Sequence, residues 1–257
     1  MTFLVSATDL LGRFLRNHKT TTVQIGKDKV EVFDWGYERI VKFNGVVYSR
    51  LNTESIYTHE YWDFLVPLGF AWQNPRLLMI GLGGGTIAYE LNKLRGPAVS
   101  IEAVEINREM IGIMKDFLKE DVGMKVEVGD GAEYVRGKED MYNVIILDAY
   151  INDLIPKQFF SREFVEDVNA ALTEDGIFAM NYIKSSNGYE NFETYVRLLK
   201  SFFKVYKLHT GFFTSNTVIV CSKKYGKEEL VGRIRSIFKE DSQNYFMLDS
   251  YERMEEL

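Results

Sequence analysis

The chain is poor in the side chains that most often build metal sites and covalent crosslinks. It has one cysteine and three histidines in 257 residues. A single thiol, Cys221, excludes a disulfide framework and a thiolate zinc cluster. His18, His59 and His209 lie far apart and lack the HxxxH spacing of a zincin site. We therefore expect no bound metal.

Long hydrophobic runs and an excess of positive charge are also missing. No run approaches the ~20 apolar residues of a membrane span, and the N-terminus has only Phe3-Leu4-Val5 before polar residues intervene, too little for a signal peptide. The net charge is −6 and the pI about 5.3, without a basic block. This balance argues against nucleic-acid binding. We expect a soluble, cytoplasmic protein with no nucleic-acid or membrane partner, large enough to fold without crosslinks.

The first quarter of the chain has the composition of a small β unit. Residues 20–51 are rich in β-branched and aromatic residues, and Asn44-Gly45 between two apolar runs is a strong hairpin signal. Helical spacing precedes this segment in residues 1–19 and follows it in 54–66, where Pro67 ends the pattern. These features predict an N-terminal domain over 1–66 and a second domain over 67–257.

From residue 76 the pattern alternates between buried strands and amphipathic helices. Such alternation is typical of an α/β fold with a parallel sheet and right-handed crossovers. The tail, 226–257, has mixed charge and helical character. The predicted strands are 77–81, 100–106, 124–130, 143–150, 176–183, 204–210 and 217–223, and the predicted helices are 86–93, 107–119, 161–172 and a segment from 188 to about 201.

A glycine-rich turn, IGLGGGT (80–86), joins the first of these strands to its helix. Its glycines expose backbone N–H groups, and the helix N-terminus adds partial positive charge. The spacing of Gly81, Gly83, Gly84 and Gly85 is that of S-adenosyl cofactor sites rather than the dinucleotide GxGxxG. The alternative is a tight turn without a ligand.

Three later strands each end in a carboxylate, where ligands of open α/β sheets bind. Glu105 follows Gly85 by twenty residues and is suited to ribose hydroxyls. Asp130, between two glycines, is suited to an adenine amino group. Asp148 follows four apolar residues, where burial and neighbours tune its pKa. Each carboxylate also has a structural reading, as a solvated strand end or a turn cap, and their co-occurrence favours a site.

Between residues 40 and 180 a series of short blocks follows in a fixed order: FNGVVYS, the THE of 58–60, VPL (66–68), NPRLLMIGLGGGT, AVEIN, VGDGAEYV, VIILDAY, Pro156, SREF (161–164), Leu172 and Gly176. In these blocks the chain resembles the spermidine synthases, which are polyamine aminopropyltransferases, as a divergent member. The small β unit ahead of a Rossmann-like domain also matches.

The resemblance implies a Rossmann-like sheet of the S-adenosylmethionine-dependent methyltransferase type with a small N-terminal antiparallel β unit, assembled as a homodimer or homotetramer. It implies that decarboxylated S-adenosylmethionine gives its aminopropyl group to a small-molecule amine such as putrescine. The implied cofactor residues are Gly81, Gly83, Gly84, Gly85, Glu105 for the ribose, and Asp130 with Ala132 for adenine. Asp148 is the implied catalytic carboxylate.

The acceptor end is less well matched. His59 and Glu60 align with the family's Tyr-His-Glu segment, whose tyrosine corresponds to Tyr57 or Tyr61. We take Tyr57 as catalytic, and His59, Glu60, Tyr61, Tyr150 and Asp153 as substrate contacts.

Three positions depart from the family pattern. Gly83 replaces an Asp that faces the cofactor's tail amine, so intact S-adenosylmethionine is no longer excluded. Ile151 replaces the second Asp of D-S-x-D-P, and Tyr48 replaces a Gln. The leading hypothesis is an aminopropyltransferase. The alternatives are a methyltransferase that uses S-adenosylmethionine and a non-catalytic relative that binds the adenosyl cofactor.

Overall fold

The computed structural model describes residues 20–151, 154–183, 189–210, 216–241 and 243–257. The helix expected over 1–19 and the candidate Asp153 lie outside these ranges.

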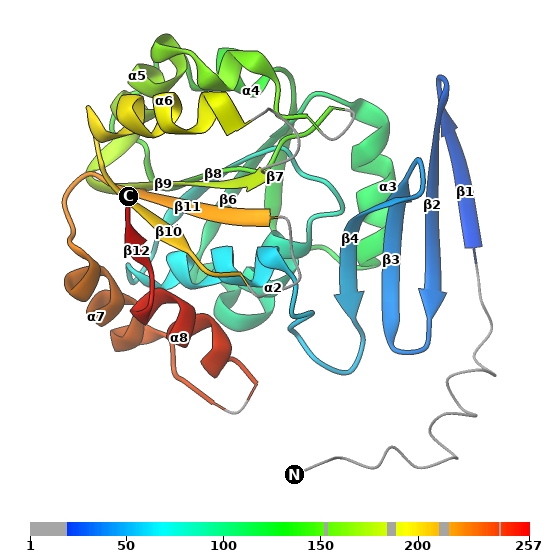
Figure 1. The fold of residues 1–257 in the computed structure, drawn as a ribbon. Helices are drawn as coiled ribbons and strands as arrows, with labels where there is room; N and C mark the ends of the chain where they lie inside the picture. Colours follow the sequence, from blue (N-terminus) through cyan, green and yellow to red (C-terminus); the bar gives the residue numbers. More distant parts are fainter. Residues whose placement is uncertain (1–19, 152–153, 184–188, 211–215, 242) are drawn as a thin grey trace.

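The N-terminal unit is a four-stranded antiparallel meander that stands beside the larger domain (Figure 1). Asn44 and Gly45 both take positive φ, 50° and 86°, which confirms the predicted hairpin turn. Arg39 Nη1 donates to the carbonyl oxygen of Phe117, and so ties the meander to helix α3 (Arg108–Leu118) of the larger domain. Its strands are β1 Thr20–Ile25, β2 Asp28–Trp35, β3 Glu38–Phe43 and β4 Val46–Asn52.

The larger domain has an eight-stranded sheet in the order β12-β10-β11-β9-β8-β5-β6-β7. The five strands from β9 to β7 are parallel, and β11 runs antiparallel to β9. The chain reverses its direction of strand addition between β5 and β8, which makes this the switch point where ligands bind. The strands are β5 Arg76–Ile80, β6 Ser100–Glu105, β7 Met124–Val128, β8 Tyr142–Leu147, β9 Leu172–Ile183, β10 Lys204–Leu208, β11 Asn216–Ser222 and β12 Glu255–Glu256.

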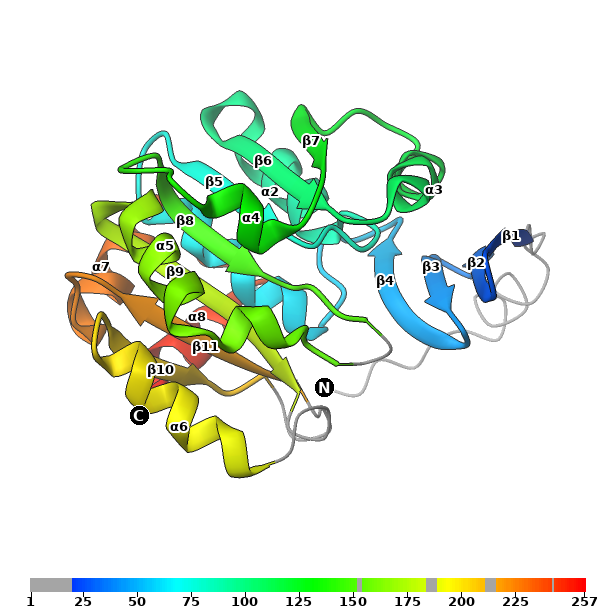
Figure 2. The same ribbon diagram turned by 90° about the horizontal axis from the view of Figure 1, so that it is seen from above.

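Helices cover both faces of this sheet and bury two apolar clusters (Figures 1 and 2). One cluster includes side chains of η1, α2, α3, α7 and α8, and the other those of α5 and α6. None of the helices in the described ranges is long and apolar enough to cross a bilayer. The helices are η1 Tyr61–Phe70, α2 Thr86–Arg95, η2 Gly96–Ala98, α3 Arg108–Leu118, α4 Gly131–Val135, η3 Lys157–Phe160, α5 Arg162–Ala171, α6 Tyr189–Lys200, α7 Lys227–Ile237 and α8 Tyr245–Glu252.

The α/β fold class is confirmed, but of the predicted helix over 54–66 only residues 61–66 are helical, and residues 54–60 are not. In residues 53–60, backbone N–H groups donate to side chains instead of to helical carbonyl groups. Asn52 Oδ1 accepts from the N–H groups of Glu54 and Ser55, and Asp63 accepts from that of Thr58. A helix of 3₁₀ turns, η1, begins only at Tyr61, and it runs through Pro67 and the predicted domain boundary to end at Phe70. The short helix α4 was not predicted, and β9 begins four residues early.

Candidate active site

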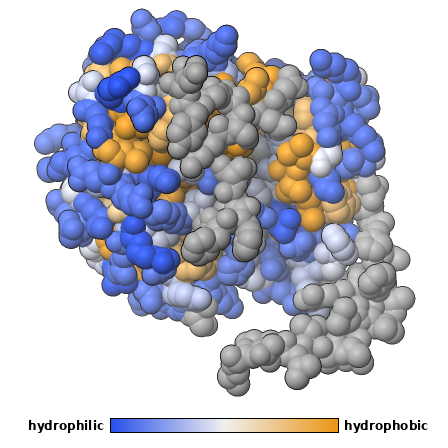
Figure 3. Space-filling view, in the orientation of Figure 1, coloured by the Kyte–Doolittle hydropathy of each residue, from blue (hydrophilic) through white to orange (hydrophobic). Residues whose placement is uncertain are grey.

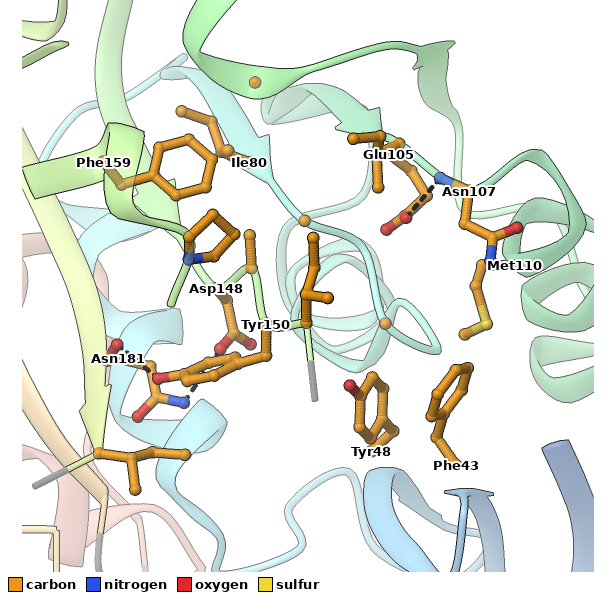
Figure 4. A pocket seen from close by; sticks show the side chains of 18 of the residues that line it. Phe43, Tyr48, Ile80, Glu105, Asn107, Met110, Asp148, Tyr150, Phe159 and Asn181 are labelled. Atoms are coloured by element: carbon orange, nitrogen blue, oxygen red, sulfur yellow. Dashed lines mark hydrogen bonds between the residues drawn. The ribbon is translucent and has the colours of Figure 1, made fainter. Parts of the chain in front are cut away.

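A cavity of about 680 Å³ opens at the switch point, between the carboxyl ends of the parallel strands and the N-terminal meander (Figure 4). Its floor is formed by the ends of β5, β6 and β8. The β3–β4 hairpin contributes Phe43 and Tyr48, whose rings stack with centroids 5.0 Å apart. The meander therefore closes a site that the sheet alone would leave open.

The four glycines of the 81–85 turn divide into two pairs with different surroundings. Gly81 and Gly83 line the cavity. A Cβ on Gly81 would lie 2.4 Å from the backbone oxygen of Asp148, so only glycine lets β5 and β8 end this close together. Gly84 instead donates its N–H to Ser49 Oγ at 2.6 Å, and a Cβ on Gly85 would contact Met114. Gly84 and Gly85 thus hold the turn against β4 and α3.

Glu105 ends β6 with its carboxylate fixed by backbone donors. Oε2 accepts from the N–H of Leu82 at 3.1 Å, and Oε1 accepts from that of Asn107 at 2.9 Å. Burial raises the pKa of Glu105, and these N–H groups oppose the rise. Since a carboxylate oxygen can accept two hydrogen bonds, each retains capacity for a ligand hydroxyl. A vicinal diol such as a ribose fits this geometry.

Asp130 caps helix α4 at the next corner of the cavity. Oδ1 accepts from the N–H of Ala132 at 2.7 Å, and Oδ2 accepts from Gln158 Nε2 at 3.1 Å. Ala132 itself lies outside the lining of the cavity, in a smaller neighbouring hollow. Ile106 lines the cavity and is 57% exposed, so it offers an apolar surface on which a base can stack.

Asp148 follows β8 and is held by two neutral donors, one of which, Asn181, is labelled in Figure 4. Tyr61 donates its hydroxyl to Oδ2 at 3.0 Å and lies 3.2 Å from Oδ1, and Asn181 Nδ2 donates to Oδ1 at 3.0 Å. Burial raises the pKa of Asp148, while hydrogen bonds from Asn181 and Tyr61 oppose that rise. Burial, reinforced by the negative charge of Asp148, raises the pKa of Tyr61 well above its usual value. Asp148 is therefore an acceptor without a cationic partner among the hydrogen bonds described.

Two asparagines that the sequence did not single out complete this end of the cavity. Asn181, on β9, is 1% exposed, and its Oδ1 accepts from Asn216 Nδ2, on β11, at 2.9 Å. Tyr150 lines the cavity and donates its hydroxyl to the backbone oxygen of Asn181 at 2.7 Å. The signal in the sequence was a lone asparagine inside the apolar strand GIFAMNYI.

The other predicted acceptor residues are separated by the fold. Tyr57 is buried with its ring against Phe246, and His59 packs on the same ring at 4.7 Å; neither lines the cavity. Glu60 and Tyr61 do line it. Glu60 lies 3.6 Å from Arg50 Nη2. Burial raises the pKa of Glu60, and the charge of Arg50 opposes the rise.

A buried pair of acids shapes the turn that presents Glu60 and Tyr61. Asp63 is fully buried and accepts hydrogen bonds from Thr58 N, Thr58 Oγ1 and His59 N, at 2.9, 2.8 and 2.7 Å. His59 adopts a positive φ of 63° in this turn. Beside Asp63 lies Glu90, also fully buried, and burial together with the charge of Asp63 raises the pKa of Glu90 well above its usual value. Glu90 therefore holds its proton to a higher pH than an exposed glutamate does.

The described lining of the cavity is acidic. It holds five carboxylates and two cationic side chains, and such a balance favours a cationic ligand. Within the described ranges, no group of three or more His, Cys, Asp or Glu side chains is arranged to hold a metal ion. The carboxylates are Asp28, Glu60, Glu105, Asp130 and Asp148, and the cations are Lys27 and Arg50.

The fold and this cavity together define a Rossmann-like protein with a cavity at the switch point of its sheet. The chain belongs to the spermine/spermidine synthase family, whose domain model matches residues 60–226. It is 30% identical to the polyamine aminopropyltransferase of Prochlorococcus marinus (strain MIT 9312) over 205 residues, and this match covers 76% of this chain and 71% of that protein. A probable polyamine aminopropyl transferase of Bifidobacterium longum (strain NCC 2705) is 32% identical over 111 residues, 43% of this chain and 25% of that protein.

Solved structures share the fold. Spermidine synthase from Thermotoga maritima matches with a TM-score of 0.65 and 20% identity, over 90% of this chain and 83% of that one. A spermidine synthase in complex with the transition-state analogue AdoDATO gives the same score and identity, over 90% and 82%. Human methyltransferase-like protein 13 in complex with SAH matches with a TM-score of 0.57 and 22% identity, over 73% of this chain and 89% of that one. The same architecture is therefore found in spermidine synthases and in a methyltransferase-like protein.

Proposed function

We propose that the protein is an aminopropyltransferase of the spermidine synthase type, with decarboxylated S-adenosylmethionine as donor and a polyamine such as putrescine as acceptor. Membership of the family makes the chain a transferase. The observation that carries the proposal is the buried Asp148, held by Tyr61 and Asn181 in the same cavity as Glu105 and Asp130. One carboxylate faces the acceptor end while the other two face the nucleoside end.

The donor supplies a sulfonium whose carbon is open to attack. The chain contributes the geometry around it: Glu105 accepts from the ribose hydroxyls, Ile106 supports the base, and Gly81 leaves room beside the end of β8. Because the attack is an in-line displacement, holding the donor and acceptor in register provides much of the rate enhancement.

The acceptor must present an uncharged nitrogen. An alkylamine with a pKa of about 10.4 needs about 4–5 kcal/mol to lose its proton at pH 7. A buried carboxylate assists this step in two ways: its raised pKa brings it closer to that of the amine, and its oxygen orients an N–H so that the lone pair faces the sulfonium. Asp148 can do both, with Tyr61 as its fixed hydrogen-bond donor.

Methyl transfer from intact S-adenosylmethionine is a second candidate, supported by the part of the cavity beside Gly83 and Arg50, where the amino-acid tail of the cofactor would lie. Gly83 carries no charge where an acidic residue would repel a carboxylate. Arg50, next along β4 from the Ser49 that holds the glycine turn, also lines the cavity. A cation there favours a carboxylated tail. Its guanidinium is shared between Glu38 and Glu60, which weakens this attraction.

Mass spectrometry of products distinguishes the two reactions. With decarboxylated cofactor and putrescine, aminopropyl transfer yields methylthioadenosine and a lengthened amine; with S-adenosylmethionine, methyl transfer yields S-adenosylhomocysteine. Asp148→Asn is the matched variant, since it keeps the size of the side chain and removes its charge. Absence of methylthioadenosine across several diamines would refute the aminopropyltransferase, and cofactor binding unaffected by Asp148→Asn without turnover would indicate a non-catalytic relative.

A further inference from the structure

Buried Asn181 and half-buried Asn216 form a hydrogen-bonded relay that ends on Asp148. Asn181 lies on β9 opposite Val218, and Asn216 is two residues from Val218 along the antiparallel strand β11. At this diagonal spacing the two side chains share one face of the sheet, and both line the cavity. Asn216 Nδ2 donates to Asn181 Oδ1 at 2.9 Å, and Asn181 Nδ2 donates to Asp148 Oδ1 at 3.0 Å.

Amide chemistry makes the direction of this relay significant. An amide nitrogen can only donate and a carboxylate can only accept, so the donor from Asn216 fixes which end of the Asn181 amide turns towards Asp148. If the Asn181 amide were reversed, its oxygen would face the carboxylate, and that arrangement is favourable only when Asp148 is protonated. The orientation of the amides is thus coupled to the ionisation of Asp148.

The relay also selects which oxygen of Asp148 remains available. Among the residues that the structure describes, Asn181 at 3.0 Å and Tyr61 at 3.2 Å both donate to Oδ1, whereas Oδ2 accepts from Tyr61 alone, at 3.0 Å. Oδ2 therefore keeps the greater accepting capacity towards the cavity.

We propose that Asn216 is a positioning residue that, through Asn181, holds Asp148 as an ionised acceptor with Oδ2 directed at the acceptor amine. The proposal rests on the proposed function for the identity of that amine, but its effect on Asp148 is a property of the ligand-free chain. It accounts for a hydrogen-bonded pair of amides, of which Asn181 is buried, where β9 and β11 meet the cavity.

Other ionisable groups near Asp148 set the background for a pH test. Tyr61 of η1 donates a hydrogen bond to Asp148. Burial, together with the negative charge of Asp148, raises the pKa of Tyr150, which follows β8. Tyr48 of β4 and Tyr182 of β9 also raise the pKa of Tyr150, and Glu60 and Arg50 line the same cavity. The tyrosine hydroxyls ionise far above neutral pH, so they do not titrate on the acid limb of an activity profile.

The test replaces Asn216 with Leu, which has a similar size and no donor. Without the donor, Asn181 can reverse, protonation of Asp148 becomes easier, and the acid limb of kcat/KM moves to higher pH. We expect kcat/KM to fall roughly tenfold at the acid end of the profile and the loss to shrink as the pH rises, because the substitution removes a hydrogen bond that supports a charged group. Asn216→Gln, which retains a donor, should restore much of the wild-type profile.

Two further variants separate this role from a general loss of structure. Ser222→Ala removes a buried polar group at the other end of β11, where Ser222 Oγ accepts from Tyr225 N–H, and it should leave the acid limb in place. In an Asn181→Leu background, Asn216→Leu should move the acid limb no further, because the relay is already broken. An additional shift in the double variant would overturn the proposal.

A readout independent of turnover keeps this inference separate from the proposed function. The Asp148 carboxyl is followed by ¹³C NMR in the ligand-free protein labelled at aspartate, with Asp148→Asn to assign its signal. An upward move of its titration in Asn216→Leu supports the relay even if no donor is turned over; an unchanged titration refutes it. If Asn216→Leu does not fold, Asn216→Ala provides the same comparison.

Discussion

The buried acid pair behind the cavity makes a quantitative prediction about stability. Glu90 is fully buried beside Asp63, and its pKa lies well above the ordinary 4.5. In the unfolded chain the same side chain ionises near 4.5. The folded state must therefore hold a proton that the unfolded state has released, and Glu90→Gln, which is neutral at every pH, removes this difference.

The sign and size follow from proton linkage. Below pH 4.5 both states carry the proton, and Glu90 adds no pH dependence. Above that value only the folded state keeps it, so each further pH unit removes about 1.4 kcal/mol of stability until the folded pKa is reached. Between pH 5.5 and pH 7, wild type should therefore lose stability relative to Glu90→Gln, with a slope of at most about 1.4 kcal/mol per pH unit. Burying the amide adds an offset that is the same at both pH values.

Urea unfolding followed by tryptophan fluorescence measures this difference, since the chain has three tryptophans. The free energies of unfolding of wild type and Glu90→Gln should diverge as the pH rises, while the m-values stay unchanged. Glu102→Gln is a control of opposite sign, because a hydrogen bond from Tyr142 lowers the pKa of Glu102, so its contribution is present above 4.5 and is lost in acid. Parallel stability curves for wild type and Glu90→Gln would refute a protonated Glu90.

Three more predictions concern the cavity and the glycine turn. Gly84→Ala should destabilise by about 1–3 kcal/mol because its Cβ would lie 2.6 Å from Ser49 Cβ, whereas Gly112→Ala, on open helix surface, should stabilise by about 0.5–1 kcal/mol; thermal unfolding checks both. Tyr61→Phe should lower kcat roughly tenfold or more, and Tyr57→Phe, outside the cavity, should leave kcat unchanged; equal losses in steady-state assays would contradict this assignment. Glu105→Gln should raise the calorimetric Kd of the adenosyl donor about tenfold, and an unchanged Kd would remove Glu105 from the site.

The protein's fold class could be read from local pattern. Strand segments buried on both faces, such as 77–80 and 144–147, are continuous apolar runs, and alternation with amphipathic helices leaves a parallel sheet as the consistent solution. Carboxylates at the ends of such strands must gather at one edge of the sheet. For that reason Glu105, Asp130 and Asp148 share one cavity, as their positions along the chain suggested.

The segment between the two sheets was not predictable in the same way. Tyr57 and Tyr61 are four residues apart and equally aromatic, so spacing could not say which one enters the site. Hydrogen bonds from Thr58 and His59 to the buried Asp63 set a turn that sends Tyr61 into the cavity, while Tyr57 packs against Phe246 of the C-terminal helix. That choice depends on partners distant in the chain.

The sequence by itself determined the parallel sheet, the hairpin at Asn44-Gly45 and the three strand-end carboxylates, because each follows from local spacing and backbone preference. Only the tertiary structure decided which glycines meet the cavity and which contact Ser49 and Met114, since their surroundings come from β4 and α3. It likewise decided the relay to Asp148, because Asn181 and Asn216 meet through antiparallel pairing of strands 35 residues apart.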